Sequence, residues 1–310
     1  MAVLLSTKAQ AMKAWRDALL AVDPTLDIRM FPDAGDPAGI EAAVVWTAHD
    51  MAELRRYPKL KLIVSMGAGV DHLLRPPGPP PGIPVARLVD RMLTTQMGEW
   101  VLLNVLRFHR QDPDYRAQQR DRVWRELPAP VTAERRIGIL GLGELGTHAA
   151  GLLRGIGFPV MGWTRRPKAV EGVENLHGPD GLRAMAARSD ILVCLLPLTP
   201  ETRGIVDASL LGLMPRGGFV INGARGGHVV DADLLAALDG GHLAGAALDV
   251  FQPEPLPADH PYWSHPKVVM TPHAASITIP ASAAPQVVDN LRRAREGRPL
   301  VNLVDFSAGY

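Results

Sequence analysis

Three residues in the second half of the chain, Arg225, Glu254 and His273, have side chains that together could hold a small organic acid and transfer a proton to it. Each residue follows a separate apolar run of the kind that forms a strand. A guanidinium can hold a carboxylate through two parallel hydrogen bonds, and an imidazole can protonate a carbonyl oxygen. A carboxylate beside the imidazole would favour its protonated form. The three residue types therefore predict a site for a keto or hydroxy acid.

Taken singly, these residues also have structural explanations. His273 could be a solvated loop residue or a helix cap, Glu254 a surface turn residue, and Arg225 a partner for a helix C-terminus. Three compatible side chains at three strand ends of one sheet favour the catalytic interpretation. His260 and His265, taken with His273, do not have the spacing of a zinc site, so no metal is expected.

A glycine-rich loop upstream predicts a dinucleotide cofactor. Residues 136–146 read RIGILGLGELG, an apolar strand that runs into G-x-G-x-x-G and then into a helical pattern. Such glycines allow a tight turn, a close approach of backbone N–H groups to a pyrophosphate, and close packing of helix on strand. FAD and S-adenosylmethionine proteins share parts of this pattern, and a purely structural glycine turn is the other alternative. The candidate cofactor contacts here are Gly141, Gly143, Glu144, Leu145 and Gly146.

The end of the next predicted strand indicates which dinucleotide is bound. NAD sites usually have an acidic residue there, which bonds the ribose 2′-hydroxyl. In this chain Trp163 is followed by Thr164, Arg165 and Arg166. Two guanidinium groups and a hydroxyl suit a 2′-phosphate, whereas an acid would repel it. We therefore expect NADP, with NADPH preferred over NADH, the alternative being that these are solvated loop cations.

A second glycine turn, in the first third of the chain, is a candidate anion site. Residues 65–72 read SMGAGVDH, a strand end that turns into a helix. Its exposed backbone N–H groups suit a carboxylate, although a plain turn is an equal alternative. Trp46 ends the preceding strand and could wall the same site or lie in the core. The expected substrate contacts are Trp46, Ala68, Gly69, Val70 and Arg225.

The elements that must position these residues alternate between short apolar runs and helical patterns, which predicts parallel sheets covered by helices. Strands are expected over residues 2–5, 27–31, 43–46, 60–66 and 84–88, and then over 136–140, 160–163, 190–196, 218–222, 245–249 and 268–270. The Pro-rich stretch 75–84 is expected to be a surface loop. A long helix over 95–111, stopped by Pro113, should cross into a second domain.

The predicted fold is α/β, with two doubly wound, Rossmann-like domains and the active site in the cleft between them. A helix over 281–296 should pack back on the first domain. The substrate-binding domain is thus expected to comprise residues 1–95 plus 281–310, and the dinucleotide-binding domain residues 96–280.

The composition is that of a globular protein with a small-molecule partner. The chain has 310 residues, 47% of them hydrophobic, and a formal net charge of +1. The balanced charge argues against nucleic-acid and membrane partners, and no stretch reaches the roughly 18 apolar residues of a membrane span. A cytoplasmic location is expected. The single cysteine, Cys194, lies in an apolar run and is expected to be a buried, inert thiol.

Six motifs in this order resemble the D-isomer-specific 2-hydroxyacid dehydrogenase family over nearly the whole chain. They are Gly67–Asp71, Gly141–Gly146, Leu196–Thr199 with Thr202, Asn222–Gly226, Asp249–Pro255 and Thr271–His273. Within the family the chain is most similar to the glyoxylate/hydroxypyruvate reductase A type. That similarity is carried by Trp163–Arg165, Asp231–Leu238 and the closing Ala308–Tyr310.

The resemblance implies roles for the matching residues. His273 matches the general acid, Glu254 its partner, and Arg225 the residue that holds substrate, while Gly67–Val70 match a segment whose backbone binds the substrate carboxylate. Further cofactor contacts are implied at Leu196, Pro197, Thr202, Ala224 and Asp249, the last on the nicotinamide carboxamide. The family also implies a homodimer joined through the nucleotide-binding domain. One departure is Arg166-Pro167, which replaces a more usual small polar and basic pair.

The sequence therefore predicts an NADPH-dependent reductase of small 2-oxo acids, with glyoxylate and hydroxypyruvate as the leading substrates. Two alternatives remain. One is another dehydrogenase of the same fold, of the formate or phosphite type, and the other is a non-catalytic scaffold that senses a dinucleotide. The sequence does not rank the 2-oxo acids or indicate a pathway.

Overall fold

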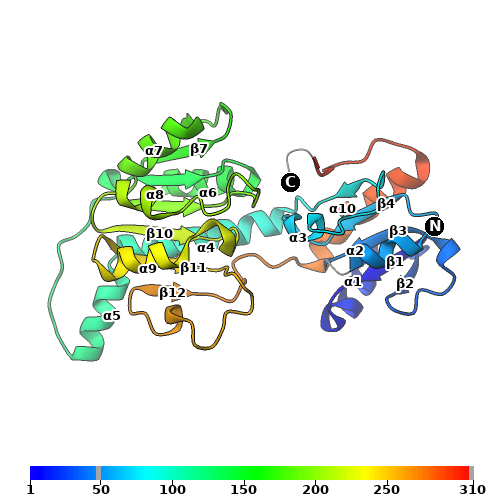
Figure 1. Cartoon of the computed structure of the whole chain (residues 1–310), viewed down its shortest axis with the longest axis horizontal. Coiled ribbons are helices and arrows are strands. Elements are labelled where there is room, and N and C mark those ends of the chain that lie inside the picture. Colours follow the sequence, from blue (N-terminus) through cyan, green and yellow to red (C-terminus); the bar gives the residue numbers. More distant parts are fainter. Residues whose placement is uncertain (47–49, 307–310) are drawn as a thin grey trace. The chain divides into compact units, whose positions relative to one another are not determined.

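A computed structural model describes residues 1–46 and 50–306 of the chain (Figure 1). Two compact units are present: Met1–Leu93 with Ile277–Tyr310, called unit 1, and Thr94–Ser276, called unit 2. The closing motif Ala308–Tyr310 lies outside the described residues.

Unit 1 is built on a five-stranded parallel sheet with the order β2-β1-β3-β4-β5. Its strands are β1 (Ala2–Ser6), β2 (Asp27–Met30), β3 (Ile40–Val45), β4 (Leu62–Ser65) and β5 (Val85–Ala86). All five strands were predicted, although β3 begins earlier than expected and β5 is shorter. The strand β2 pairs with β1 on one side, and the chain then returns to place β3 on the other side of β1. The carboxyl ends of β1 and β3 therefore flank a switch point, where ligands bind in such sheets.

Helices cover both faces of this sheet (Figure 1). On one face Val3 and Leu5 pack with α1 (Ala9–Val22) and α10 (Pro280–Glu296). On the other face Ala2 and Leu4 pack with residues of α2 (Asp50–Glu53), η2 (Leu54–Arg56) and α3 (Asp71–Leu74). The alternation along β1 follows from the two-residue repeat of a strand. A short helix, η1 (Pro37–Gly39), precedes β3, and residues 75–84 form a loop, as expected.

Unit 2 contains a seven-stranded sheet with the order β12-β11-β10-β9-β6-β7-β8. Its strands are β6 (Ile137–Leu140), β7 (Val160–Thr164), β8 (Glu174–His177), β9 (Ile191–Cys194), β10 (Gly218–Asn222), β11 (Leu243–Leu248) and β12 (Val268–Met270). Six of them were predicted, and the parallel pairing confirms the doubly wound arrangement. The prediction missed β8, because the edge sequence ENLH lacks the apolar residues that indicate a strand.

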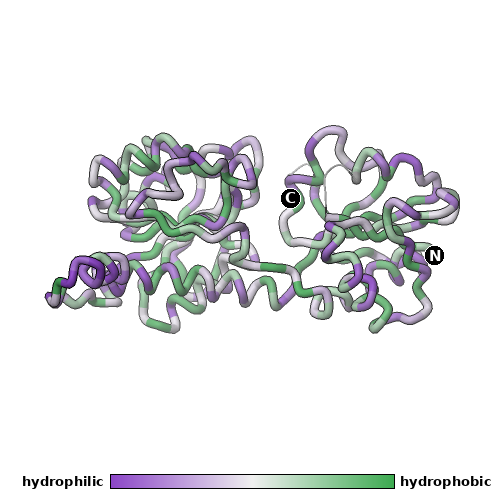
Figure 2. Tube along the Cα trace, turned by 90° about the horizontal axis from the view of Figure 1, so that it is seen from below, coloured by the Kyte–Doolittle hydropathy of each residue, from purple (hydrophilic) through white to green (hydrophobic). Residues whose placement is uncertain are grey.

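The two faces of this sheet are covered by different helices (Figure 1). One face packs on α4 (Arg91–His109) and α6 (Glu144–Ile156), and the other on α7 (Gly178–Arg188), α8 (Ala208–Leu213) and α9 (Asp231–Asp239). Figure 2 shows hydrophobic segments of the chain, in green, in the middle of each unit. Cys194 is buried, as predicted. Within residues 1–46 and 50–306, no helix combines the length and the apolar character of a membrane span.

The prediction that Pro113 stops the long helix was wrong. The helix α4 ends at His109, and Gln111 adopts a left-handed backbone with φ 58°. Pro113 instead lies in the first turn of a further helix, α5 (Asp112–Asp121), where a missing N–H group costs no hydrogen bond. The short helices of unit 2 are η3 (Thr132–Glu134), η4 (Gly226–His228) and η5 (Pro261–Trp263).

The buried imidazole of His109 makes the stability of unit 2 depend on pH. Its ring packs edge-on against Phe158, with centroids 5.0 Å apart. Burial, with the nearby charges of Arg135 and Arg110, lowers the pKa of His109. The unfolded chain, in which histidine titrates near pH 6.5, then binds a proton that the folded chain excludes. Stability is therefore complete above about pH 6.5 and falls as the pH drops below that value.

We expect His109 to lower the free energy of unfolding, measured with urea, as the pH falls from about 6.5 to 5.5. In a His109→Gln variant this dependence should become weaker, since glutamine has no proton to gain in that range. An unchanged pH dependence in the variant would mean that His109 is not its source.

Candidate active site

The loops that carry Arg225, Glu254 and His273 leave one edge of the seven-stranded sheet. In the paired strands β10, β11 and β12, Asn222 lies opposite Leu248, and Leu248 lies opposite Met270. Because the strands are parallel, the loops that follow these three residues begin side by side at the carboxyl edge. Ligands bind at this edge in open α/β sheets.

His273 and Glu254 are in direct contact. The Nδ1 atom of His273 lies 2.7 Å from Oε2 of Glu254. The other carboxylate oxygen accepts a hydrogen bond of 2.9 Å from the backbone N–H of Phe251. Burial raises the pKa of Glu254, but the hydrogen bonds from His273 and Phe251 outweigh burial, and the net shift is downward. An ionised carboxylate can only accept, so Nδ1 donates, and Nε2 is the nitrogen that remains for a substrate.

The backbone of His273 is held in an unusual conformation. It has φ 53°, the left-handed region that residues other than glycine rarely adopt. Its N–H group donates to the carbonyl oxygen of Asp249 over 2.7 Å. Such strain persists only where surrounding contacts impose it, and it concentrates at functional sites. The conformation thus independently marks His273 as a candidate functional residue.

Asp249 imposes this turn through its side chain. The carboxylate accepts hydrogen bonds from the backbone N–H groups of Ala274 (2.8 Å) and Ala275 (3.0 Å) and from the hydroxyl of Thr271 (2.5 Å). Thr271 in turn accepts a bond of 3.1 Å from the indole N–H of Trp100. The resemblance implied a cofactor contact at Asp249. In this structure its carboxylate binds the loop of His273, and the sequence pattern contained no signal for that contact.

Arg225 follows β10 in a tightly held turn. Its carbonyl oxygen accepts a bond of 2.9 Å from the amide of Asn222, and its guanidinium donates to the carbonyl oxygen of Ala224 over 2.7 Å. Its charge also contributes to the lowered pKa of Glu254. Asn222 accepts a bond from the N–H group of Ala224 at 3.1 Å, so both ends of its amide shape the turn.

Gly226 brings the Arg225 turn against the Glu254 loop. A Cβ atom at Gly226 would collide with the backbone of Phe251, the residue whose N–H group binds Glu254. We expect Gly226→Ala to separate the two loops and to lower kcat/KM by at least about 100-fold, since misplacing a catalytic group by about 1 Å can have that effect. Steady-state kinetics of the variant would measure the loss.

The matched control for this prediction is Gly212→Ala in α8. A Cβ atom there would meet nothing within 4 Å, so the substitution should stabilise the helix by about 0.5–1 kcal/mol and leave the kinetics unchanged. Normal kcat/KM in the Gly226→Ala variant would show that the two loops need no close approach.

The glycine loop after β6 forms an open cradle at the start of α6. Gly141 has φ 98°, and a Cβ atom at Gly146 would collide with the carbonyl oxygen of Gly141. Gly143 precedes the helix, is exposed and meets nothing within 4 Å of its Cβ position. No side chain caps the helix at that position, and Glu144 and Leu145 begin its first turn. The loop therefore fits a pyrophosphate bound on backbone N–H groups.

The loop after β7 contains the two arginines. The side chains of Arg165 and Arg166 are exposed, and neither guanidinium donates a hydrogen bond to any residue that the structure describes. The hydroxyl of Thr164 donates to the carbonyl oxygen of Arg166 over 2.6 Å. Trp163 is buried, and its indole N–H bonds the carbonyl oxygen of Gly178 at 2.8 Å. In this conformation the side chains of Trp163 and Thr164 hold the loop through hydrogen bonds to backbone carbonyls, and the two arginines present positive charge to solvent.

Two further residues support this loop and were not selected from the sequence. The amide of Asn175 in β8 accepts a bond from the N–H group of Lys168 (2.8 Å) and donates to Thr164 (2.9 Å). The ammonium group of Lys168 lies 2.5 Å from the carbonyl oxygen of Leu142 in the glycine loop. Lys168 thus links the two loops of the candidate cofactor site. The cationic run 165–168 was a signal for it, whereas Asn175 lies in the strand that the pattern missed.

The segment after β9 forms a compact turn beside these loops. The Thr202 hydroxyl donates to the carbonyl oxygen of Pro197 over 2.7 Å and accepts a bond of 2.8 Å from the N–H group of Thr199. Leu196 is buried. Because β9 lies between β6 and β10 in the sheet, this turn lies between the glycine loop and the Arg225 turn.

In unit 1, Trp46 lies against the second glycine turn. A Cβ atom at Gly67 would collide with the Trp46 ring. The His72 ring lies 4.9 Å from the Trp46 ring, and its Nε2 atom is 2.6 Å from the Trp46 carbonyl oxygen. Ala68 and Gly69 are partly exposed, whereas the Val70 side chain is buried, so Val70 can offer only its backbone to a ligand.

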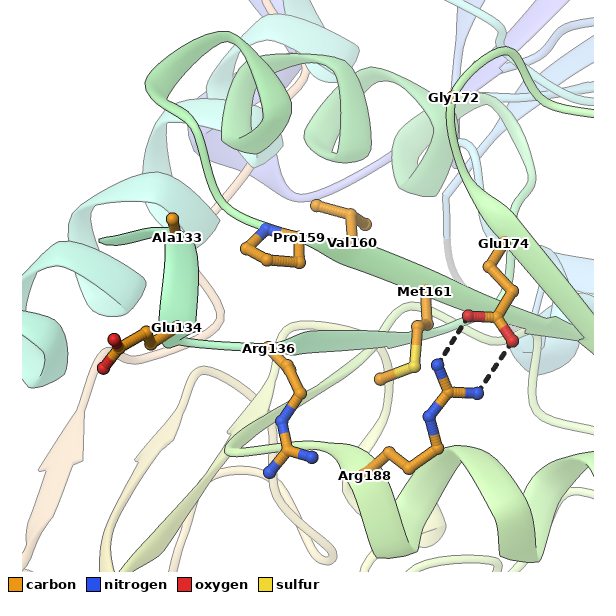
Figure 3. A pocket seen from close by; sticks show the side chains of 9 residues that line it. All are labelled: Ala133, Glu134, Arg136, Pro159, Val160, Met161, Gly172, Glu174 and Arg188. Atoms are coloured by element: carbon orange, nitrogen blue, oxygen red, sulfur yellow. Dashed lines mark hydrogen bonds and ion pairs between the residues drawn. The ribbon is translucent and has the colours of Figure 1, made fainter. Parts of the chain in front are cut away.

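A pocket of about 590 Å³ in unit 2 is not part of this site (Figure 3). Its lining includes Arg136, Pro159 and Glu174, at the amino ends of β6, β7 and β8. Figure 3 shows the double contact between Arg188 and Glu174 at its rim. The candidate residues lie at the opposite, carboxyl edge. In the described ranges, His, Cys, Asp and Glu side chains form no group of three that could hold a metal.

Comparison with known proteins confirms the resemblance. The model of the D-isomer specific 2-hydroxyacid dehydrogenase NAD binding domain matches residues 102–275. The chain is 41% identical over 303 residues to a glyoxylate/hydroxypyruvate reductase A of Yersinia enterocolitica, covering 96% of both chains. It therefore belongs to the D-isomer-specific 2-hydroxyacid dehydrogenase family.

Solved structures agree with the observed architecture. A D-isomer specific 2-hydroxyacid dehydrogenase from Xanthobacter autotrophicus Py2, in complex with NADPH and MES, is 44% identical with a TM-score of 0.95 and covers 100% of this chain and 99% of its own. An NADPH-dependent glyoxylate/hydroxypyruvate reductase from Sinorhizobium meliloti, in complex with NADP and sulfate, is 40% identical with a TM-score of 0.92 and covers 100% of both chains. The predicted α/β fold with two parallel-sheet domains is thus confirmed.

Proposed function

We propose that this chain is an NADPH-dependent reductase that converts small 2-oxo acids, glyoxylate and hydroxypyruvate first among them, into 2-hydroxy acids. The observation that carries the proposal is the contact of 2.7 Å between His273 and Glu254, at the sheet edge from which the Arg225 turn also leaves. The names of the Yersinia and Sinorhizobium relatives, and the NADPH and NADP in the solved structures, support it.

The residues present fit the cofactor. The open cradle at Gly143 would receive the pyrophosphate on backbone N–H groups, and the exposed Arg165 and Arg166 would pair with the 2′-phosphate. The turns at Leu196–Thr202 and Ala224 are proposed to line the rest of the cofactor site. When bound, NADPH supplies the hydride that reduces the carbonyl carbon.

The chain itself contributes binding and proton transfer. Arg225 would hold the substrate carboxylate and keto oxygen through its planar guanidinium. In unit 1, the N–H groups of residues 68–70, beside Trp46, are proposed to bind a carboxylate. His273 would donate the proton on Nε2 to the carbonyl oxygen. Glu254, ionised beside Nδ1, balances the positive charge of the ring before transfer and keeps it oriented.

The rate of oxidation of NADPH, compared with NADH, in the presence of glyoxylate, hydroxypyruvate and larger 2-oxo acids tests this proposal. Fast turnover with NADPH and the smaller acids is the expected result. Faster oxidation of formate or phosphite with NAD would favour a different dehydrogenase of the family. Cofactor binding without turnover on any 2-oxo acid would favour a sensing scaffold.

We further propose that unit 1 binds substrate, that unit 2 binds the dinucleotide, and that the enzyme acts in the cytoplasm as a homodimer joined through unit 2. The corresponding domain bounds are 1–95 plus 281–310 and 96–280. A cytoplasmic location is consistent with the single, buried cysteine, which needs no oxidising compartment.

Exposed apolar residues on α4, α5 and the segment after α5 support a dimer. Leu103 is 54% exposed, Val123 46% and Trp124 100%, and α5 with its following segment stands away from the sheet of unit 2 (Figure 1). A second copy would cover the apolar side chains.

Trp124→Glu is expected to convert a dimer into a monomer, because a charge would replace the most exposed aromatic side chain of this surface. Sedimentation velocity of the variant and of the wild type measures the change. Trp263→Glu, at a 57% exposed tryptophan outside this surface, is the control and should leave the mass unchanged. A monomeric wild type, or a Trp124→Glu dimer of undiminished affinity, would contradict the proposed interface.

A further inference from the structure

We infer that His228 is a positioning residue, which fixes both the substrate-holding Arg225 and the cofactor turn after β9 through the two nitrogens of one buried ring. The inference rests on the proposed function, because it takes the roles of Arg225 and of the Pro197 turn from it. His228 was not selected from the sequence, where it appears only as the residue three positions after Arg225.

The ring bridges two loops that are distant in the sequence. Its Nδ1 atom lies 3.2 Å from the backbone nitrogen of Arg225 and 3.1 Å from its carbonyl oxygen. Its Nε2 atom lies 3.2 Å from the carbonyl oxygen of Pro197. The carbonyl oxygen of Pro197 also accepts a hydrogen bond from the hydroxyl of Thr202. The His228 ring and Thr202 therefore bond the same atom of the turn after β9.

The protonation of the ring follows from these partners. A carbonyl oxygen can only accept, so Nε2 carries a hydrogen and donates to Pro197. In the neutral ring Nδ1 accepts the N–H group of Arg225, and in the charged ring it donates to the carbonyl oxygen of the same residue. Either form spans the two loops. The ring is fully buried, and water cannot replace either contact.

The backbone of His228 adds a second attachment. Its N–H group bonds the carbonyl oxygen of Arg225 at 3.2 Å, and its own carbonyl accepts a bond of 2.9 Å from Val206. The amide of Asn222 donates to the same carbonyl oxygen of Arg225 over 2.9 Å. These backbone bonds do not depend on the side chain, whereas the bonds of the ring to Arg225 and to Pro197 require a histidine.

Two substitutions separate the functions of the two nitrogens. Asparagine can place a polar atom near the position of Nδ1, and glutamine can place an amide near that of Nε2. His228→Asn should therefore keep the KM for glyoxylate and raise the dissociation constant of NADPH by about 10-fold, the effect of one unpaired buried group. His228→Gln should do the reverse, with a rise of about 10-fold in the KM for glyoxylate and unchanged NADPH binding.

His242→Asn and His242→Gln are the matched controls. The His242 ring bonds one backbone carbonyl, that of Leu211, at 2.9 Å, and lies just before β11, at the opposite edge of the sheet. These variants should change the thermal midpoint of unfolding without changing KM or NADPH affinity. NADPH binding is followed by cofactor fluorescence without substrate, and KM by steady-state kinetics, both on the full chain.

The inference is supported if His228→Asn weakens only NADPH binding and His228→Gln raises only the KM for glyoxylate. If one variant does not fold, the predicted change in the other variant is sufficient. Parallel losses in both constants, no loss in either, or two variants that do not fold would overturn it, because each result describes a merely structural histidine. Failure of the proposed function is a different result: the wild-type chain would then turn over no 2-oxo acid.

Discussion

His273→Asn is expected to lower kcat for glyoxylate by about 10²- to 10⁴-fold, the contribution typical of a positioned general acid, with little change in NADPH affinity. Asparagine is the appropriate replacement because the backbone at this position is left-handed, with φ 53°, which asparagine tolerates better than alanine. The variant should therefore keep the loop conformation and lose only the ionisable ring. Steady-state kinetics and NADPH fluorescence titration measure the two quantities.

Glu254→Gln is the companion to this experiment. Glutamine can still accept the N–H group of Phe251, which is 2.9 Å from the carboxylate, but it has no charge to balance the ring of His273. A smaller loss than that of His273→Asn is expected, because the acid itself remains. A near-normal kcat in His273→Asn would remove His273 from the role of general acid, whatever the result for Glu254→Gln.

Joint replacement of Arg165 and Arg166 by alanine is expected to raise the KM for NADPH by about 10- to 100-fold and to leave that for NADH nearly unchanged. The reason is that NADH lacks the 2′-phosphate, and that the two exposed guanidinium groups, which solvent screens, together contribute about 1.5–3 kcal/mol to its binding. Both side chains are exposed at the end of β7, so their removal should not disturb folding. Kinetics with both cofactors at saturating glyoxylate measure the change in preference.

The control for this pair is Arg188→Ala. Arg188 is bonded to Glu174 at 2.7 and 2.6 Å, at the amino edge of the same sheet. Both side chains of this ion pair are about half exposed. Its loss should affect stability by less than about 1 kcal/mol and cofactor preference not at all. If the Arg165 and Arg166 variant kept its preference for NADPH, the 2′-phosphate would have to bind elsewhere, with Lys168 as the next cation in the loop.

Much of the fold could be predicted from the sequence because buried parallel strands are short, nearly continuous apolar runs. The elements that escaped prediction are the polar ones. The strand β8 reads ENLH, and α5 reads DPDYRAQQRD, so neither has an apolar face by which a pattern could be recognised. Pro113 was interpreted as the end of a helix, although a proline is equally suited to the first turn of the next one.

The candidate site was predictable in its main residues for a related reason. A histidine, a glutamate and an arginine after three apolar runs must leave the same edge if the sheet is parallel, so strand order alone brings their loops together. The contact between His273 and Glu254 was expected on those grounds and is present at 2.7 Å. The catalytic and binding roles of these residues remain predictions that kinetics will test.

The sequence by itself determined the order of strands and helices, the glycine turns and the chemical types of the groups at the strand ends, because these depend on local patterns along the chain. Only the tertiary structure decided how those groups are held. Asp249 fixes the turn of His273, Gly226 brings two loops into contact, and His228 reaches both Arg225 and Pro197. Such contacts join residues far apart in the chain, and their directions depend on packing that no local pattern records.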